Sequence, residues 1–173
     1  VEVVDALAHL PRYHLALVGA IPASRIAEMQ TQAAELGCDA RLHVLPPVAS
    51  DDVAAYCATA DVAVVPRLPL SFQQRYSLPN KFFESVQAGL PIVAGDTPEL
   101  RRLVERFELG LAVDCRSPAG LARALARVYE SRQMYRERVL RLIQTGGRYT
   151  WESESHRLLD AYNRVIGAPS EIA

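Results

Sequence analysis

The sequence lacks several features that would assign it to a functional class at once. It has only three cysteines, widely spaced, at Cys38, Cys57 and Cys115. This number fits neither a disulfide framework nor a paired metal-binding motif. No apolar run is long enough to cross a bilayer, and the first residues do not resemble a secretory signal peptide. We therefore expect reduced, mostly buried thiols in a cytoplasmic protein.

A strong net charge is also missing, as are the common phosphate-binding loops. Nineteen Lys and Arg face 20 Asp and Glu, giving a formal net charge of −1, which argues against the basic surface of a nucleic-acid-binding protein. Residues 17–22 lack the second and third glycines of a dinucleotide fingerprint, and no Walker loop is present. The four histidines have no Cys or acidic partner at metal-ligand spacing, so we predict no metal site and interpret them as surface or core residues.

What the sequence does contain is a regular alternation of apolar runs and helical patterns. The five runs occupy residues 15–18, 42–45, 62–66, 92–94 and 110–113. Continuous apolar runs of this length are typical of strands that are buried on both faces. With helices between them, they predict an α/β fold, a doubly wound Rossmann-like parallel sheet with helices on both faces. Ligands bind such sheets beyond the carboxyl ends of the strands.

One stretch, residues 77–94, places polar groups at the entrance of a helix. Ser77, Asn80 and Lys81 surround Pro79, which suits a first helical turn because its missing N–H would have no partner there. Capping alone would explain Ser77 and Asn80. It does not explain Lys81, because the helix dipole disfavours a cation in the first turn unless an anion is bound. We therefore predict an anion site at this entrance.

Glu84 follows Lys81 by three residues on the same mostly apolar helix. A solvated carboxylate, or one paired with Lys81, is as consistent with this spacing as a functional one. In a crevice, a carboxylate can instead accept hydrogen bonds from two ribose hydroxyls. The preceding loop carries Arg67 and Arg75, which suit phosphate or sugar contacts, although most loop cations are simply solvated.

Three segments, in this order, resemble the C-terminal donor-binding domain of GT-B glycosyltransferases. They are residues 60–66, 77–84 and 88–94, and their pattern is most similar to retaining glycosyltransferase family four, often labelled glycosyl transferases group one. The resemblance extends over nearly the whole chain. It implies one half of a GT-B fold, a nucleoside-diphosphate sugar as donor, a glycan or lipid-linked acceptor and no obligatory metal or cofactor.

The resemblance also implies roles for individual residues, although it names no catalytic residue. The donor diphosphate would lie at Ser77, Leu78, Pro79, Asn80 and Lys81. Glu84 matches the acidic residue that binds the ribose hydroxyls. The loop that lines the base matches Leu45, Pro46 and Val48. Further candidates for sugar or phosphate contacts are Gly19, Arg67, Arg75 and Tyr76. Tyr76 stands where the family usually has a Glu that contacts the donor sugar.

The family's donor domain normally opens with a strand, a Gly-rich turn and an Arg/Lys pair, and residues 1–173 begin after all of these. We therefore expect residues 1–173 to be a donor-binding domain that lacks its first strand and the N-terminal acceptor domain, with a C-terminal crossing helix at residues 149–166. Such a chain alone should be inactive, and any peripheral membrane contact would belong to the missing domain. Two alternatives use the same fold: a sugar-nucleotide epimerase and a non-catalytic nucleotide-binding or interaction module.

Overall fold

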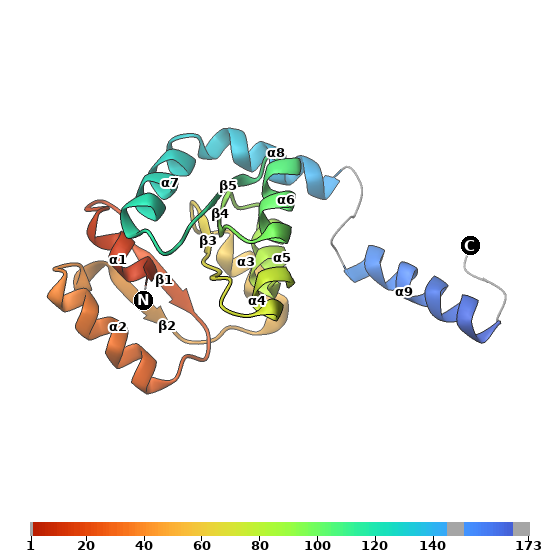
Figure 1. The fold of residues 1–173 in the computed structure, drawn as a ribbon, viewed down its shortest axis with the longest axis horizontal. Coiled ribbons are helices and arrows are strands. Elements are labelled where there is room, and N and C mark those ends of the chain that lie inside the picture. The colour runs from red at the N-terminus through yellow and green to blue at the C-terminus, as the bar shows by residue number, and fades with distance from the viewer. Residues whose placement is uncertain (1, 145–150, 168–173) are drawn as a thin grey trace.

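The computed structural model describes residues 2–144 and 151–167 and consists of parallel strands flanked by helices (Figure 1). The strands are β1 (Leu15–Val18), β2 (Leu42–Leu45), β3 (Ala63–Val65), β4 (Ile92–Gly95) and β5 (Gly110–Val113). The helices are α1 (Glu2–Ala8), α2 (Ala23–Glu35), α3 (Val53–Cys57), α4 (Phe72–Tyr76), α5 (Asn80–Gln87), α6 (Pro98–Arg106), α7 (Pro118–Glu130), α8 (Arg132–Gln144) and α9 (Trp151–Ile166). All observed strand pairs are parallel. The predicted α/β class is confirmed.

The strands form two sheets, whereas the sequence predicts one sheet with every strand buried on both faces. β1 pairs with β2, and separately β3, β4 and β5 pair in that order. Only β4 is buried along its whole length. In β1, exposure alternates, with Ala16 and Val18 open to solvent. The prediction of full burial is wrong for β1 because no strand pairs with its second edge and no helix covers one of its faces among the described residues.

The three-stranded sheet carries helices on both faces, as a doubly wound sheet requires. Ile92 and Ala94 of β4 pack on one side with α5 and α6, where Phe82 and Leu103 are almost completely buried. Val93 points to the other side and packs against α7. Residues that alternate along a strand point to opposite faces. This central strand therefore holds the two halves of the core together.

Helix α1 connects the two sheets. Val4 and Leu7 pack with α2 over one face of β1 and β2, while Ala6 and Leu10 belong to the core beside α7. The Arg41 guanidinium reaches the end of α1 and donates to the carbonyl oxygens of Leu7, Leu10 and Tyr13 at 3.0, 2.6 and 3.3 Å. The two sheets thus share one packed body even though their strands do not pair (Figure 1).

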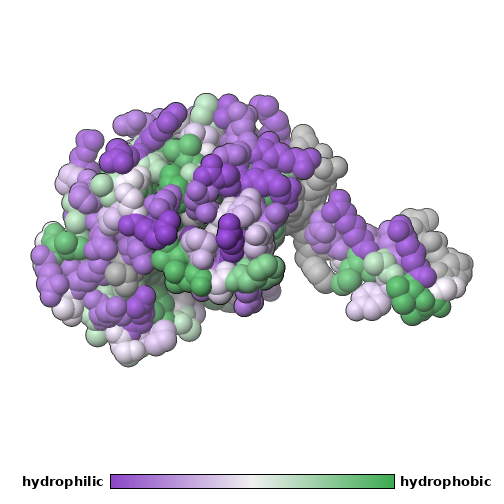
Figure 2. All heavy atoms as spheres, in the orientation of Figure 1, coloured by the Kyte–Doolittle hydropathy of each residue, from purple (hydrophilic) through white to green (hydrophobic). Residues whose placement is uncertain are grey.

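Helix α9 projects away from this body (Figure 1) and is amphipathic. Its large apolar side chains at five positions are exposed: Leu158, Leu159, Tyr162, Val165 and Ile166. Figure 2 shows apolar side chains beside hydrophilic ones on this helix. The first two residues of the predicted 149–166 segment lie outside the described residues. No helix of the described chain is long and apolar enough to cross a membrane.

Candidate functional site

The entrance of α5 lies beyond the carboxyl end of β3, where the fold predicts a ligand. Pro79 is the N-cap residue, with extended backbone angles, so the helix begins at Asn80, one residue later than predicted. No side chain caps this end. In the described chain, the backbone N–H groups of Asn80 and Lys81 have no hydrogen-bond acceptor. Free N–H groups at a helix start point outward and favour an anion.

The body of α5 anchors this entrance in the core. Phe82 and Val86 are buried among strand and helix residues, and Leu78 and Phe83 pack against the same cluster. The Ser85 hydroxyl donates to the Lys81 carbonyl oxygen at 2.6 Å. The helix ends at Gln87, and Gly89, just beyond the C-cap residue Ala88, has a φ of +69° that suits glycine. The buried side chains of α5 therefore hold the helix in the core, while Asn80 and Lys81 in its first turn are exposed to solvent.

Lys81 and Glu84 both remain available for a ligand. Lys81 is exposed and Glu84 is half-buried. Within residues 2–144 and 151–167 neither side chain forms an ion pair, so they do not pair with each other. Helix α5 packs against α3, and the pKa of the Cys57 thiol in α3 is raised first by burial and second by the charge of Glu84. That contact also brings α5 close to the segment that follows the predicted base loop.

The predicted base loop lies at the carboxyl end of β2. Leu45 closes that strand and is half-buried, as is Val48, whereas Pro46 is exposed. Gly19 follows β1 with φ +139° and open space around it, and its N–H donates to the Leu45 carbonyl oxygen at 3.4 Å. The structure therefore brings Gly19 and this loop together. No side chain here makes a contact that identifies a base.

The Arg67 side chain forms hydrogen bonds within the protein, whereas a direct ligand contact would require it to face the ligand. Arg67 is half-buried after β3, and its side chain is used internally. The Nε atom donates to the Gln74 carbonyl oxygen at 3.1 Å, and an Nη atom donates to Ser77 Oγ at 2.5 Å. These bonds connect both ends of the loop between β3 and α5. The role predicted for Arg67 as a sugar or phosphate contact stays a prediction.

Arg75 and Tyr76, two further candidates for sugar or phosphate contacts, lie in the short helix α4. Arg75 is exposed, and its guanidinium lies 5.7 Å from the centre of the Tyr76 ring. The Tyr76 ring packs against Phe72, with 4.8 Å between ring centres. Phe72 is 82% exposed and Tyr76 46%. These two rings form an exposed aromatic surface, and the roles predicted for Arg75 and Tyr76 stay predictions.

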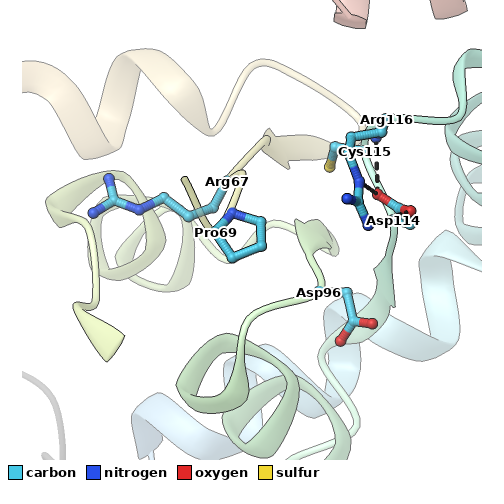
Figure 3. Close-up of a pocket in the computed structure, with 6 residues that line it drawn as sticks. All are labelled: Arg67, Pro69, Asp96, Asp114, Cys115 and Arg116. Carbon is cyan, nitrogen blue, oxygen red and sulfur yellow. Dashed lines mark hydrogen bonds and ion pairs between the residues drawn. The ribbon is translucent and has the colours of Figure 1, made fainter. Parts of the chain in front are cut away.

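A small cavity of about 60 Å³ lies beside this region, at the carboxyl ends of β3, β4 and β5 (Figure 3). Its lining residues are Arg67, Pro69, Asp96, Asp114, Cys115 and Arg116. The carboxylates are already paired: Asp96 binds Arg101 at 2.5 Å and Asp114 binds Arg116 at 2.9 Å. Burial raises the pKa of the Cys115 thiol to about 11. The cavity is therefore polar, but both of its carboxylates are paired with arginines.

Sequence reasoning did not find one contact between histidines. His14 precedes β1 and His43 lies in β2, and their ring nitrogens Nδ1 and Nε2 are 2.8 Å apart on the exposed face. No pattern in the sequence indicates this contact, because it depends on the parallel register, which sets Ala16 opposite His43. No group of three or more potential metal ligands exists among the described residues.

The sequence of this chain matches a known protein family and several curated relatives. The family model described as Glycosyl transferases group 1 matches residues 1–131. D-inositol 3-phosphate glycosyltransferases from Nocardioides sp. and Geodermatophilus obscurus are similar, with 30% and 32% identity over 140 and 135 residues. These matches cover 77% and 78% of this chain. The chain spans less than a third of the length of these relatives, 29% and 28%.

Solved structures agree with this family in fold. A sucrose-phosphate synthase from Thermosynechococcus elongatus superposes with a TM-score of 0.74 at 23% identity, covering 97% of this chain and 42% of that one. Anabaena Alr3699/HepE in complex with UDP gives a TM-score of 0.75 at 20% identity, covering 94% and 44%. The chain belongs to the glycosyl transferases group 1 family and has the fold of a GT-B glycosyltransferase domain.

Proposed function

We propose that this chain is the donor-binding half of a retaining glycosyltransferase, which transfers a sugar from a nucleoside-diphosphate sugar to a glycan or lipid-linked acceptor. The observation that carries the proposal is the entrance of α5. Its two unpaired N–H groups and the Lys81 ammonium, which has no carboxylate partner in the described chain, together suit a diphosphate. The structural neighbour in complex with UDP supports a nucleotide ligand.

The proposed chemistry is mainly electrostatic. When the bond between the sugar and the diphosphate breaks, negative charge grows on the diphosphate, and preorganised donors stabilise it. We assign this task to Lys81 and the N–H groups of α5 without an obligatory metal. Glu84 would accept hydrogen bonds from the ribose hydroxyls, and Leu45, Pro46 and Val48 would line the base. Activity of the full-length protein that persists in EDTA is the expected result.

The sheet topology supports a further part of this proposal. β1 pairs on one edge only, and so does β3. A strand placed between these two free edges would join both sheets into one. We propose that a strand outside this chain occupies that position. The exposed apolar side of α9, which includes Leu158 and Tyr162, would cross to the acceptor domain. Transfer would then require residues outside this chain.

The acceptor and any peripheral membrane contact belong, in this proposal, to that other domain. A cytoplasmic location agrees with the three free cysteines, Cys38, Cys57 and Cys115. The named relatives are glycosyltransferases, which does not favour the epimerase or the non-catalytic module. Proton NMR of the product formed by the full-length protein tests retention. A product whose anomeric configuration differs from that of the donor sugar would contradict it.

Thermal unfolding with and without nucleotides tests the donor site directly. UDP, GDP, ADP and their sugars should be compared at equal concentration. A nucleotide present at 100 times its Kd should add about 2.7 kcal/mol to the free energy of unfolding. The matching nucleoside should add much less, because it lacks the diphosphate. If no nucleoside diphosphate raises the unfolding temperature of the full-length protein, the proposed donor site is wrong.

A further inference from the structure

The backbone of Arg67 is held in place by its neighbours on two strands. A Cβ atom added at Gly95 would lie 2.1 Å from the Arg67 carbonyl oxygen and 2.5 Å from its backbone nitrogen. The Arg67 backbone also lies beside the Cys115 thiol, where its N–H lowers the pKa of that thiol against the larger, opposite effect of burial. Arg67 is thus packed against the ends of both β4 and β5. Figure 3 shows its guanidinium directed away from the cavity that its backbone helps to line.

From this fixed position the guanidinium determines where Ser77 lies. It bonds to the Gln74 carbonyl oxygen within α4 and to the Oγ atom of Ser77, the residue that ends α4. Only Leu78 and Pro79 separate Ser77 from the first turn of α5. One side chain therefore connects the end of β3 to the start of the proposed diphosphate site.

The direction of this hydrogen bond has a chemical consequence. A guanidinium has donors only, so Ser77 Oγ accepts from Arg67. The Ser77 hydroxyl proton therefore stays available, and it has no acceptor among the described residues. A hydroxyl that accepts from a cation becomes a stronger donor, because hydrogen bonds in a chain polarise one another.

We propose that Arg67 is a positioning residue for the donor diphosphate: it fixes and polarises the Ser77 hydroxyl, which then donates to a phosphate oxygen, while Arg67 itself does not touch the ligand. This inference rests on the proposed function of the α5 entrance. It differs from direct phosphate binding by Arg67, because two of the three guanidinium nitrogens, Nε and one Nη, already donate to Gln74 and Ser77.

Calorimetric titration of the full-length protein tests this proposal. The ligands are the nucleoside diphosphate that raises the unfolding temperature and its nucleoside. The variants are Arg67→Gln, Arg67→Lys, Ser77→Ala and the double variant Arg67→Gln/Ser77→Ala. Arg106→Gln serves as the matched control, since Arg106 is exposed on α6 and stacks on Phe107. Circular dichroism confirms that each variant is folded, and Arg67→Lys retains the cation if Arg67→Gln does not fold.

We expect Arg67→Gln and Ser77→Ala each to weaken diphosphate binding about tenfold or more, the effect of one lost hydrogen bond to a charged group. Nucleoside binding should change less than about twofold in both variants, and the double variant should bind as a single one does, because the two residues act in series. Arg67→Lys should recover part of the loss, and Arg106→Gln should bind like the wild type.

Four results would overturn the proposal in different ways. Equal losses for nucleoside and diphosphate would make Arg67 a general brace of the loop. Losses that add in full in the double variant would mean that Arg67 contacts the ligand directly. Unchanged binding in Arg67→Gln, with tight binding by the wild type, would remove Arg67 from the site and leave the proposed function standing. Absence of diphosphate binding in the wild type would remove both.

Discussion

Substitution of Glu84 offers a test in which loss of function separates from loss of stability. Its side chain is half-buried on the first turns of α5 and forms no ion pair or hydrogen bond in the described chain. Removal of a surface side chain without such partners changes the free energy of unfolding by about 0.5 kcal/mol or less. Glu84→Ala should therefore remain folded with nearly the same unfolding temperature.

The expected effect on binding is much larger. A carboxylate that accepts from both ribose hydroxyls makes two hydrogen bonds to a charged group, each contributing about 1.5 to 3 kcal/mol. Loss of the weaker estimate for both amounts to about 3 kcal/mol, which corresponds to a roughly 100-fold rise in Kd. Glu84→Gln should lose less, because an amide oxygen still accepts but carries no charge.

The ribose itself provides the decisive control. Calorimetric Kd values should be measured for a nucleoside diphosphate and for its 2′-deoxy form, in wild type, Glu84→Ala and the exposed α2 variant Glu35→Gln. The wild type and Glu35→Gln should discriminate against the deoxy ligand, and Glu84→Ala should not. If Glu84→Ala keeps the wild-type discrimination, or binds both ligands as tightly as the wild type, Glu84 is not the ribose ligand.

Three further predictions concern the scaffold of the site. Phe82→Ala should cost about 3 to 5 kcal/mol of unfolding free energy in urea titration, because the ring is 2% exposed in the core; a cost below 1 kcal/mol would contradict its packing. Gly95→Ala should cost about 3 kcal/mol or more, since the added Cβ meets the Arg67 backbone, whereas substitution of Gly37, around which space is open, should not produce such a clash. Burial raises the pKa of the Cys115 thiol from 9.0 to about 11, so it should have roughly 100-fold less thiolate at pH 8 than an ordinary thiol. Its labelling by iodoacetamide should accelerate as the pH rises from 8 to 10. Fast labelling at pH 8 in the folded protein would refute this buried environment.

The order and kind of the strands could be predicted because they depend on local patterns. Apolar runs flanked by turn residues identified all five strands among the described residues, with each end within one residue of the observed one. The α/β class followed from the helices between them. Strand pairing is different, because it depends on partners far apart in the sequence. The apolar run at residues 15–18 looks as buried as the run at 92–94. Only the structure shows that β1 has one neighbour while β4 has two.

The residues of the candidate site also differ in whether the sequence alone could predict them. Lys81 and Glu84 could be selected from spacing, since a helix fixes which positions share its first turns. The partners of Arg67 could not be selected, because the sequence gives a loop arginine no direction. Its bonds to Gln74 and Ser77 depend on how the chain turns after β3. Tyr76 is similar: its position in the sequence indicates a departure from the family, but its packing against Phe72 is a property of α4.

In the proposed site, the stretch that begins at Ser77 would serve two purposes that place opposite demands on it, at different positions along one helix. Ligand binding requires unpaired polar groups, which α5 presents only in its first turn, at Asn80 and Lys81. Stability requires burial, which Phe82 and Val86 supply immediately afterwards. Because the polar turn is continuous with a buried one, its N–H groups cannot shift without moving the core. A diphosphate would therefore meet donors that are already in place, so that little ordering free energy opposes binding.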